Sequence, residues 1–490
     1  MTLDPTDWDD TRRLGREMVD DMITWLQTVR ERPVWQSVPE TVKAEIDAPT
    51  PRAGQPLAEV YDAFRRNVLP YPTGNIHPRF WGWVMGTGSV TAMLAEMLAS
   101  GMNPHLAGYD QSASLIEKQV LTWLTDLMGF PVGSSGVLVS GGTAANLNGL
   151  MSARVAKAGY DIRAKGAHGG PQLTVYGGAE THSWILKACE TMGLGRDAWR
   201  PAAVDADYRV DLAALRARIV QDIDAGLRPF CIIGNAGTVN TGAIDDLPAL
   251  RQLADEFDLW FHIDGAYGAL AAWSSEPELV AGQETADSLA FDLHKWGYLP
   301  YEAGVILTRD PQAQVATYQP ANAKPPAYLI SAEGGIATGT TYFADRDLQL
   351  SRNFKALKVW MCLKEQGADR IGAAIQGNID QARYLGRLVE AAEDLELLAP
   401  VSLNAVCFRY APAGLDAEAL NPLNMKILIE LQKRGIAVPS QTILQDRYAI
   451  RVCNTNHRSE MSDFDLLVDS VRTIGAELVA GGFGFGKDPA

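Results

Sequence analysis

Short apolar segments alternate with helix-length segments between about residue 88 and residue 310, and this pattern constrains the fold more than any other feature. Each segment is apolar along most of its length, which is typical of strands buried on both faces of a parallel sheet. Alternating strands and helices predict an α/β domain whose mainly parallel sheet is covered by helices on both sides. The predicted strands are Val137–Val139, Leu173–Tyr176, Cys231–Gly234, Leu259–Asp264, Ser288–Asp292 and Gly304–Leu307.

Two further regions flank this domain. Leu14, Met18 and Met22 recur at helical spacing and predict an opening helix, after which prolines interrupt residues 31–75. The segment 310–345 is rich in Pro, Ala, Gly and Thr, and we expect it to be structureless and to act as a lid. The expected parts are a helical N-terminal arm at residues 1–87, the large α/β domain at residues 88–370, and a small α+β C-terminal domain at residues 371–490 with strands at Val401–Arg409 and Tyr448–Cys453.

Two strand ends carry complementary chemistry. Asp264 ends one predicted strand, and Lys295 follows another, directly behind His294. Ligands of parallel sheets bind beyond the carboxyl ends of the strands, so both side chains are expected to face one site. An amine that can form a Schiff base and a carboxylate that keeps a pyridine nitrogen protonated are the two groups that pyridoxal 5′-phosphate (PLP) requires. Taken alone, Lys295 could lie at the surface, and Asp264 could bind a metal together with His262. The sequence offers no further acidic or histidine cluster to complete such a site, so no metal is expected.

Two strand-to-helix junctions could complete a cofactor site. Ser140-Gly-Gly-Thr143 follows an apolar run and precedes a helix, where backbone N–H groups and the helix dipole converge on an anion. The alternative is a tight turn with Thr143 as a simple cap. His182 occupies a second junction, where its ring could stack on a flat cofactor or merely cap the helix. In combination with Lys295, these junctions favour a cofactor that bears a phosphate.

Composition excludes several classes of partner. A net charge of −16 argues against binding to nucleic acid. The N-terminus is acidic, and no apolar run approaches the roughly 18 residues that span a bilayer, so we expect a cytoplasmic protein with no membrane partner. The five cysteines are scattered, and several lie in apolar runs, which favours buried thiols. Gly481–Lys487 nearly matches a phosphate-binding loop, but Asp488 replaces the required Ser or Thr, so we expect a loose tail.

Several segments, taken in order, resemble the group II PLP-dependent decarboxylases, the family of aromatic-L-amino-acid and glutamate decarboxylases. The segments are Ser140–Thr143, Thr181–Ser183, Gly237–Thr238, His262–Tyr267 and Asp292–Trp296. The likeness extends over most of the chain and includes His77–Trp83 near the front and Arg451–Arg458 near the end. It implies the fold of type I PLP enzymes, with a seven-stranded-type sheet, and a homodimer with a swapped N-terminal segment.

The resemblance also assigns roles to individual residues. Lys295 would form the Schiff base, Asp264 would pair with the pyridinium, and His182 would stack over the cofactor ring with Ala266 beneath it. The residues implied for the phosphate are Gly142, Thr143 and His294, and further cofactor-binding candidates are Thr238 and Asp292. Asp292 lies where the aromatic enzymes have an asparagine, and Val239 lies where they have a threonine.

The implied reaction is decarboxylation of an L-amino acid, with an aromatic one favoured, to the amine and carbon dioxide through a Schiff base and a quinonoid. In the family a tyrosine on a mobile loop, supplied across the dimer interface, delivers a proton, and phenylalanine in its place leads to an aldehyde. Tyr342 is the catalytic tyrosine candidate here, although counting back from Phe354 favours Phe343 by one position. Both assignments stay open, as does a decarboxylating aldehyde synthase or a carbon–carbon lyase.

Substrate choice rests on one segment near the front of the chain. The residues that resemble the side-chain pocket of the aromatic enzymes are Phe80, Trp81, Trp83 and Val84. Aromatic walls suit an aromatic side chain. The alternative is a hydrophobic core patch where the arm docks, and Arg79 could instead serve an acidic substrate. A phosphate- or metal-dependent hydrolase is the remote alternative for the whole constellation, and it predicts a colourless protein.

Overall fold

The computed structural model describes residues 2–319, 335–336, 338 and 341–481. Contacts within the chain group it into two compact units. The first unit consists of Met1–Trp83, Tyr384–Leu398 and Cys407–Ala490, and the second consists of Val84–Arg383 and Ala399–Val406. The domain boundaries expected after residues 87 and 370 remain predictions.

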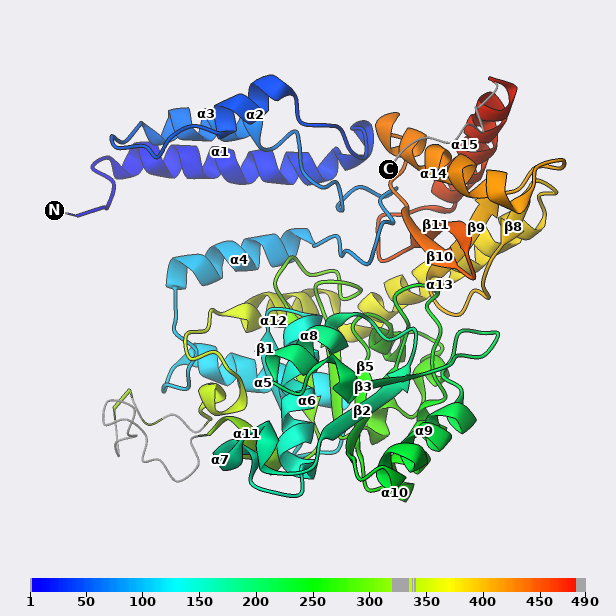
Figure 1. Ribbon diagram of the computed structural model, residues 1–490. Helices are drawn as coiled ribbons and strands as arrows, with labels where there is room; N and C mark the ends of the chain where they lie inside the picture. The colour runs from blue at the N-terminus through cyan, green and yellow to red at the C-terminus, as the bar shows by residue number, and fades with distance from the viewer. Residues whose placement is uncertain (1, 320–334, 337, 339–340, 482–490) are drawn as a thin grey trace. The chain divides into compact units, whose positions relative to one another are not determined.

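A seven-stranded sheet forms the centre of the second unit (Figure 1). Its order is β1-β7-β6-β5-β4-β2-β3, and the strands from β6 to β3 are all parallel, whereas β7 runs antiparallel to both β6 and β1. The α/β class with a mainly parallel sheet is therefore confirmed, and each predicted strand of this domain is present. The strands are β1 Ser135–Val139, β2 Leu173–Gly178, β3 Trp199–Ala202, β4 Arg228–Asn235, β5 Trp260–Asp264, β6 Ser288–Asp292 and β7 Gly304–Thr308.

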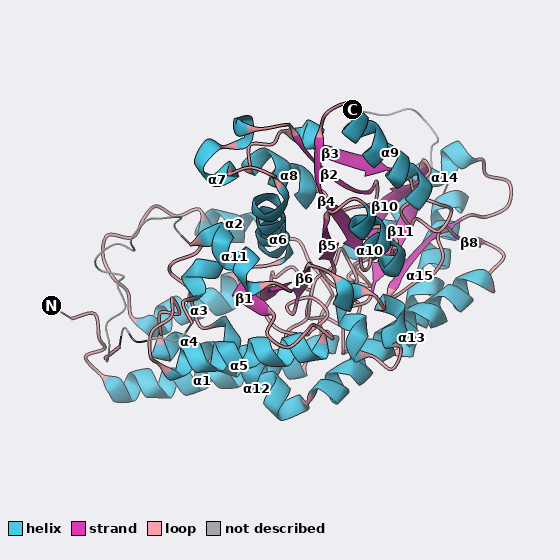
Figure 2. Cartoon of the chain, turned by 90° about the horizontal axis from the view of Figure 1, so that it is seen from below, coloured by secondary structure: helices cyan, strands magenta, loops and turns pink. Residues whose placement is uncertain are grey.

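Helices cover both faces of this sheet (Figure 2). Helix α6 (Gly142–Lys157) packs on the face that His262 presents, because a Cβ built on Gly149 would lie 2.7 Å from the His262 ring. The opposite face carries α10 (Leu247–Glu256), whose leucines contact Gly234 beside Phe261. Neighbouring residues of β5 thus point to opposite layers, as strand geometry requires. The other helices of this unit are α4 Val90–Met102, α5 Ser112–Leu127, α7 Ile162–Lys165, α8 Trp184–Thr191, α9 Leu212–Asp224, α11 Pro311–Tyr318 and α12 Lys355–Gln366, and α13 Ala368–Glu390 continues into the first unit.

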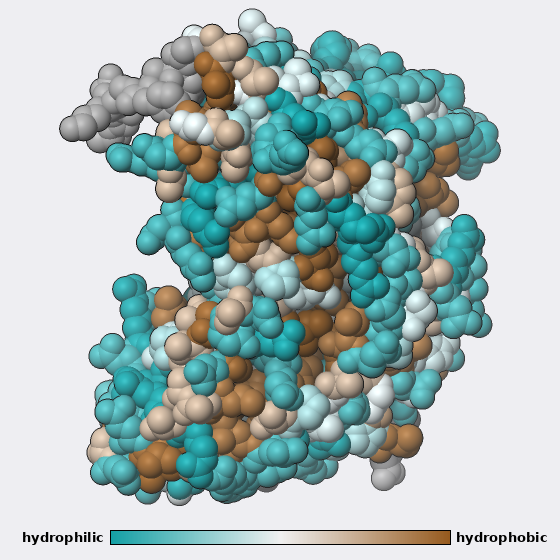
Figure 3. Space-filling view, turned by 90° about the vertical axis from the view of Figure 1, so that its right-hand side faces the viewer, coloured by the Kyte–Doolittle hydropathy of each residue, from teal (hydrophilic) through white to brown (hydrophobic). Residues whose placement is uncertain are grey.

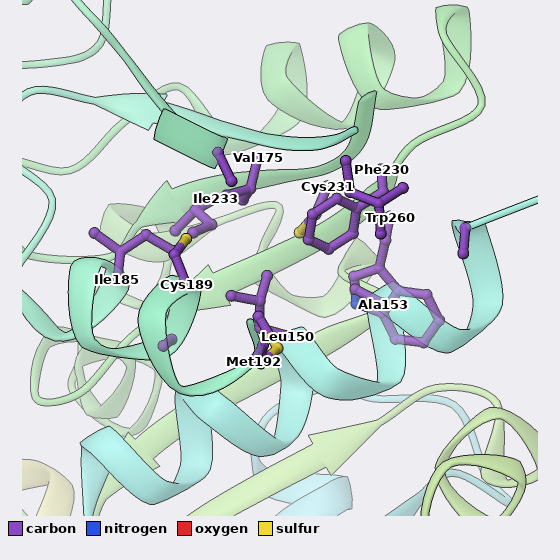
Figure 4. Close-up of a cluster of buried hydrophobic side chains, with 14 of the residues drawn as sticks. Leu150, Ala153, Val175, Ile185, Cys189, Met192, Phe230, Cys231, Ile233 and Trp260 are labelled. Carbon is purple, nitrogen blue, oxygen red and sulfur yellow. The ribbon is translucent and has the colours of Figure 1, made fainter. Parts of the chain in front are cut away.

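A hydrophobic core fills the layer between α6, α8 and the sheet (Figure 4). Leu150 and Ala153 come from α6, Ile185 and Cys189 from α8, and Trp260 from β5, and all of them are buried. Burial of this apolar area fixes the two helices on the sheet. It therefore fixes the positions at which both helices begin, and those starts carry candidate site residues.

The expectation of a structureless segment from residue 310 to 345 is wrong at its beginning. Residues Pro311–Tyr318 form α11, and the Asp310 side chain caps it by accepting a hydrogen bond from the Gln312 N–H at 2.9 Å. Proline at the first helical position suits this start, because its missing N–H would have no partner there. Within the rest of the expected lid, residues 320–334, 337 and 339–340 lie outside the described residues.

The first unit combines the predicted opening helix with a small sheet. The sheet order is β10-β11-β9-β8, and β10 pairs antiparallel with β11, as β8 does with β9. The two predicted C-terminal strands are thus present, next to two short strands that the sequence did not predict. The elements are α1 Trp8–Gln27, α2 Glu40–Ile46, α3 Leu57–Asn67, β8 Leu395–Leu397, β9 Ala405–Tyr410, α14 Ala417–Lys433, β10 Ser440–Leu444, β11 Arg447–Cys453 and α15 Met461–Ala480. The phosphate-loop-like tail that follows lies outside the described residues from residue 482 onward.

Within this unit, the segment near the front of the chain lies against the segment near its end. The Cys453 N–H donates to the Trp81 carbonyl at 3.0 Å, and the Arg451 guanidinium donates to the Trp83 carbonyl at 2.7 Å. The Asn456 side chain donates to the His77 carbonyl at 2.7 Å. The two outlying segments that carry the resemblance therefore form one structural feature.

Surface and thiols complete the description. Hydrophilic residues cover much of the face shown in Figure 3, with hydrophobic residues exposed among them. All five cysteines lie in the described part of the chain and are buried. Among the described helices, none combines the length and the apolar character needed to cross a bilayer.

Candidate active site

Lys295 and Asp264 lie at the carboxyl ends of neighbouring parallel strands. Asp264 is the last residue of β5, and Lys295 follows β6, which pairs with β5. The Asp264 side chain is buried, and the Lys295 side chain keeps 22% of its surface exposed. Burial alone lowers the pKa of Lys295, but the carboxylates of Asp292 and Asp264 outweigh burial, and the net pKa is raised. The amine and the carboxylate predicted from sequence are therefore close enough to interact.

The Asp264 carboxylate is held by two donors. Trp184 Nε1 donates to Oδ2 at 2.6 Å, and the Ala266 N–H donates to Oδ1 at 3.1 Å. Trp184 is the first residue of α8 and is buried. Hydrogen bonds to an ionised carboxylate favour its charged form. Sequence reasoning missed Trp184, and the only signal for it was its place two residues after His182.

Both ring nitrogens of His262 lie within hydrogen-bonding distance of other side chains, which argues against His262 as a metal ligand. Nδ1 lies 2.7 Å from Ser288 Oγ, and Nε2 lies 2.8 Å from Asn146 Oδ1. Burial lowers the pKa of His262 to about 4, so the ring is neutral near pH 7. The Trp184 ring meets it edge to face at 5.9 Å between centroids. His262 thus supports Trp184 and, through it, Asp264.

The Gly-rich turn leads directly from β1 into α6. Helix α6 begins at Gly142 after an N-cap at Gly141, and no described side chain caps it, so Thr143 is not the cap and its side chain is exposed. A Cβ built on Gly142 would lie 2.8 Å from Asp292 Oδ2. Only glycine fits this close approach. The first N–H groups of a helix have no intrahelical partner, so the turn offers anion donors beside Asp292 and Lys295.

His294 and Asp292 line the same corner. His294 Nδ1 accepts a hydrogen bond from the Ala303 N–H at 3.1 Å, and its Nε2 lies 3.7 Å from Asp292 Oδ2. Burial lowers the pKa of His294, with Asp292 opposing and the nearby lysines assisting, so the ring is a neutral donor. Asp292 Oδ2 lies 3.0 Å from Lys295 Nζ. Tyr301, which sequence reasoning missed, places its ring 4.5 Å from that of His294, between centroids.

The remaining candidates for cofactor binding are His182, Ala266 and Thr238, and each has different contacts. The exposed His182 lies just before the N-cap of α8, Ser183, and its ring accepts a hydrogen bond from the Trp184 N–H at 3.2 Å. Partial desolvation lowers the pKa of His182, while Asp264 opposes this shift and Lys295 assists it. Ala266 accepts a hydrogen bond from the Asp292 N–H at 2.9 Å through its carbonyl. Thr238 is buried in the loop after β4 and contacts Thr241 at 3.1 Å between hydroxyl oxygens.

Comparison with known proteins gives this geometry a family. Residues 39–411 match the family model for the pyridoxal-dependent decarboxylase conserved domain. The chain belongs to this family. It is therefore a PLP-dependent amino acid decarboxylase with a type I fold, and the resemblance drawn from the motifs is confirmed.

Relatives of this family differ in the amino acid that their names specify. The aromatic-L-amino-acid decarboxylase of Bacillus atrophaeus is 32% identical over 475 residues, which cover 96% of each chain. The L-2,4-diaminobutyrate decarboxylase of Rhizobium meliloti (strain 1021) is 31% identical over 432 residues, covering 88% of this chain and 84% of the relative. The structure of Oryza sativa TDC with PLP and tryptamine has a TM-score of 0.88 at 25% identity, covering 97% of this chain and 100% of that one. These likenesses establish the family and leave the substrate undetermined.

The corner around Lys295 fits PLP on its own chemistry. An amine and a buried carboxylate lie at adjacent strand ends, and a glycine-only approach brings the first turn of α6 beside them. Asp292 Oδ1 is buried, and within the described ranges nothing donates a hydrogen bond to it, so a polar group of a ligand can pair there. The chain thus offers partners for an aldehyde, a pyridine nitrogen and a phosphate.

Tyr342 and Phe343, the two candidates for the loop position, have different surroundings. The Phe343 ring is 0% exposed and lies under the Arg352 guanidinium at 5.2 Å. Tyr342 is half-buried, and a Cβ built on Gly108 would lie 2.8 Å from its ring. Phe343 is therefore a core residue of its own chain, whereas Tyr342 keeps part of its surface exposed, although its hydroxyl oxygen is buried.

The four candidate residues for the substrate pocket also differ in burial. Phe80 and Trp81 are buried in the first unit, where Trp81 stacks on Phe464 at 4.8 Å between ring centroids. Their burial favours the alternative of a core patch where the arm docks. Trp83 is 54% exposed and Val84 is half-buried, so both keep surface for a ligand. Arg79 donates to the Ile436 carbonyl at 2.7 Å, a structural use of the guanidinium that competes with a role toward an acidic substrate.

Proposed function

We propose that this chain decarboxylates an aromatic L-amino acid to the corresponding amine and carbon dioxide. The observation that carries the proposal is the placement of Lys295 and Asp264 at neighbouring strand ends, with the exposed His182 bordering both. These three side chains supply an amine, a carboxylate and a flat ring in one site. The identity of 32% with an aromatic-L-amino-acid decarboxylase over 96% of both chains supports the aromatic substrate.

Each cofactor group has a proposed partner in the chain. Lys295 would hold the aldehyde carbon, Asp264 the pyridine nitrogen, and the first turn of α6 with His294 the phosphate. When bound, PLP accepts electrons from the bond between the substrate Cα and its carboxylate as carbon dioxide leaves. The hydrogen bond from Trp184 holds the Asp264 carboxyl group in place, so Asp264 can pair with the pyridine nitrogen. His182 would pack on the ring and exclude water from that face.

Proton delivery to the substrate carbon is assigned to Tyr342. Phe343 is wholly buried beneath Arg352 and has no acidic hydrogen, whereas Tyr342 carries a hydroxyl, which is buried while the rest of the residue is partly exposed. A tyrosine at this place supports the amine as product. Replacing the phenol with a phenyl ring would remove the proton donor and favour aldehyde formation, the outcome expected if Phe343 instead takes the catalytic position.

The aromatic side chain of the substrate is assigned to Trp83 and Val84, which keep exposed surface, whereas Phe80 and Trp81 are buried. A partly exposed indole provides a large flat contact surface for an aromatic ring. A diamine-forming decarboxylase, like the Rhizobium meliloti relative, would instead need a carboxylate to pair with the distal amine of its substrate. The comparison of aromatic and diamino acids is therefore the decisive substrate test.

We further propose that the enzyme works as a cytoplasmic homodimer. Helix α4 exposes a row of large apolar side chains, and such a surface on a monomer commonly marks an interface. The row consists of Val90, Met97, Leu98 and Met102. The five buried cysteine thiols suit a reducing compartment.

Product analysis with a panel of L-amino acids tests reaction and substrate together. The purified enzyme is supplied with phenylalanine, tyrosine, tryptophan, 2,4-diaminobutyrate and glutamate, and amine, aldehyde, ammonia and peroxide are quantified. We expect amine from an aromatic substrate without ammonia or peroxide. Aldehyde with ammonia and peroxide would contradict the assignment of Tyr342, and amine from 2,4-diaminobutyrate alone would contradict the aromatic substrate. A Tyr342→Phe variant is expected to shift the product toward aldehyde. Its matched control, Phe343→Leu, is expected to leave the amine as the product.

A further inference from the structure

Asp292 is the buried acid beside Lys295, and its two carboxylate oxygens have different surroundings. The residue ends β6 and is 1% exposed. Oδ2 accepts a hydrogen bond from Lys295 Nζ at 3.0 Å, and His294 Nε2 lies 3.7 Å from the same oxygen. Oδ1 is also buried, and no residue in the described part of the chain donates to it. One oxygen is therefore committed to the lysine, whereas the other is available to a ligand.

This carboxylate lies against the start of α6. A Cβ built on Gly142 would lie 2.8 Å from Oδ2, and one built on Gly141 would lie 3.8 Å from Oδ1. The N–H groups of the first turn and the helix dipole attract an anion to this place. The proposed phosphate position thus adjoins the carboxyl group that pairs with Lys295. A second anionic group brought into a buried site disfavours the ionised form of the first.

The nearest proton belongs to Lys295. Burial on its own lowers the pKa of Lys295, and the charge of Asp292 is the main influence that reverses this effect, ahead of Asp264. Once Asp292 is neutral, only Asp264 and Tyr301 still oppose the effect of burial, which favours the free amine of Lys295. A free amine is the form that attacks an aldehyde.

We propose that Asp292 is a positioning residue that takes the proton of Lys295 when the phosphate group of PLP binds. The proton moves from Nζ to Oδ2 along the existing hydrogen bond, so the phosphate faces a neutral carboxyl group. The amine nitrogen then adds to the aldehyde carbon, the aldehyde oxygen leaves as water with the two amine hydrogens, and a C=N linkage remains. No proton is exchanged with solvent in this sequence. The inference rests on the proposed placement of the phosphate at α6.

The titratable groups that face this pair come from several elements. Lys295 and His294 follow Asp292 on its own segment, whereas the first turn of α6, Gly142–Ala145, contains no charged residue. The other groups that act on this pair or on His294 are Asp264 at the end of β5, Tyr301 and Glu302 before β7, and Lys358 of α12. All of them are present with either cofactor form, so a comparison of cofactors with and without phosphate isolates the effect of the phosphate.

The test measures how fast Lys295 becomes linked to PLP and to pyridoxal, which lacks the phosphate. Full-length protein freed of cofactor is mixed with saturating amounts of each aldehyde, and the linkage at Lys295 is trapped with borohydride and quantified by peptide mass. Near pH 7 we expect the limiting rate with PLP to exceed that with pyridoxal by about tenfold or more, because only the free amine reacts. In an Asp292→Asn variant the two limiting rates should agree within about twofold.

A pH profile of the unaltered protein gives a second readout that needs no variant. With pyridoxal the limiting rate should rise about tenfold per pH unit, because Lys295 must lose its proton to solvent. With PLP it should stay flat between about pH 7 and pH 8.5, since the proton has already moved to Asp292. Equal limiting rates in the unaltered protein, an undiminished advantage of PLP in Asp292→Asn, or equal pH slopes for both aldehydes would each overturn the proposal. Failure of both aldehydes to attach to Lys295 would instead overturn the cofactor assignment beneath it.

Discussion

Gly149 allows α6 to approach β5 at His262, and this contact sets the spacing between the start of α6 and the end of β5. In a Gly149→Ala variant the new Cβ would lie 2.7 Å from the His262 ring and 3.0 Å from Ser288 Oγ. The ring cannot withdraw freely, because its nitrogens are bound at 2.7 and 2.8 Å. Overpacking costs about 1–3 kcal/mol, and a lost hydrogen bond adds about 1 kcal/mol. Replacing glycine by alanine inside a helix adds about 1 kcal/mol to the free energy of unfolding, so the expected net loss of stability is about 2 kcal/mol.

Urea unfolding followed by circular dichroism measures this change. The matched control is Gly377→Ala in α13, where a new Cβ would meet no atom of the described chain within 4 Å. The free energy of unfolding of this control should rise by about 0.5–1 kcal/mol, because only the higher helix propensity of alanine changes it. We also expect weaker retention of PLP in Gly149→Ala, because α6 and β5 would move apart. A gain in stability in Gly149→Ala equal to that of the control would refute the reasoning.

Three further predictions concern the same network and the core beneath it. Trp184→Phe should lower the free energy of unfolding of the PLP-free chain by about 2 kcal/mol, because Asp264 loses a donor at 2.6 Å, and thermal or urea denaturation measures this loss. Burial lowers the pKa of His262 to about 4, whereas a histidine in the unfolded chain has a pKa of about 6.5. Between these two pH values the unfolded chain therefore binds a proton at His262 that the folded chain does not bind. Stability should therefore fall by about 2 kcal/mol between about pH 7 and pH 5, and a His262→Gln variant should lack this part of the pH dependence. Arg352→Leu should destabilise the fold by about 3–5 kcal/mol, because it leaves Glu117 buried without its partner, and adding Glu117→Leu should recover most of that loss in a double-mutant cycle.

The sequence predicted the parallel sheet and the strand ends because buried strands require continuous apolar runs. The β5 and β6 segments show this pattern, and Asp264 and Lys295 lie where their runs end. Strand β3, Trp199–Ala202, was missed because it is only partly buried and contains Pro201, so it shows neither an apolar run nor alternation. Local patterns report burial along one element, which is why the fully buried strands were found, the edge strand β1 included, and the partly buried edge strand β3 was not.

Contacts between distant elements could not be predicted from local patterns. The bond from Trp184 to Asp264 joins the start of α8 to the end of β5, 80 positions apart in the chain. The approach of Asp292 to Gly142 depends in the same way on how α6 packs on the sheet. Trp81 shows the converse case, because its aromatic character suggested a substrate wall while its ring is a core contact of Phe464. An aromatic residue in sequence does not reveal which neighbour its ring will cover.

The account depends most on Lys295 as the residue that carries PLP. Purified full-length enzyme should show a visible absorption band, and borohydride reduction followed by peptide mass analysis identifies the modified side chain. We predict that the mass of the reduced cofactor lies on Lys295 alone. Modification of another lysine, such as the buried Lys355 or Lys358, or no modification at all, would contradict the central claim.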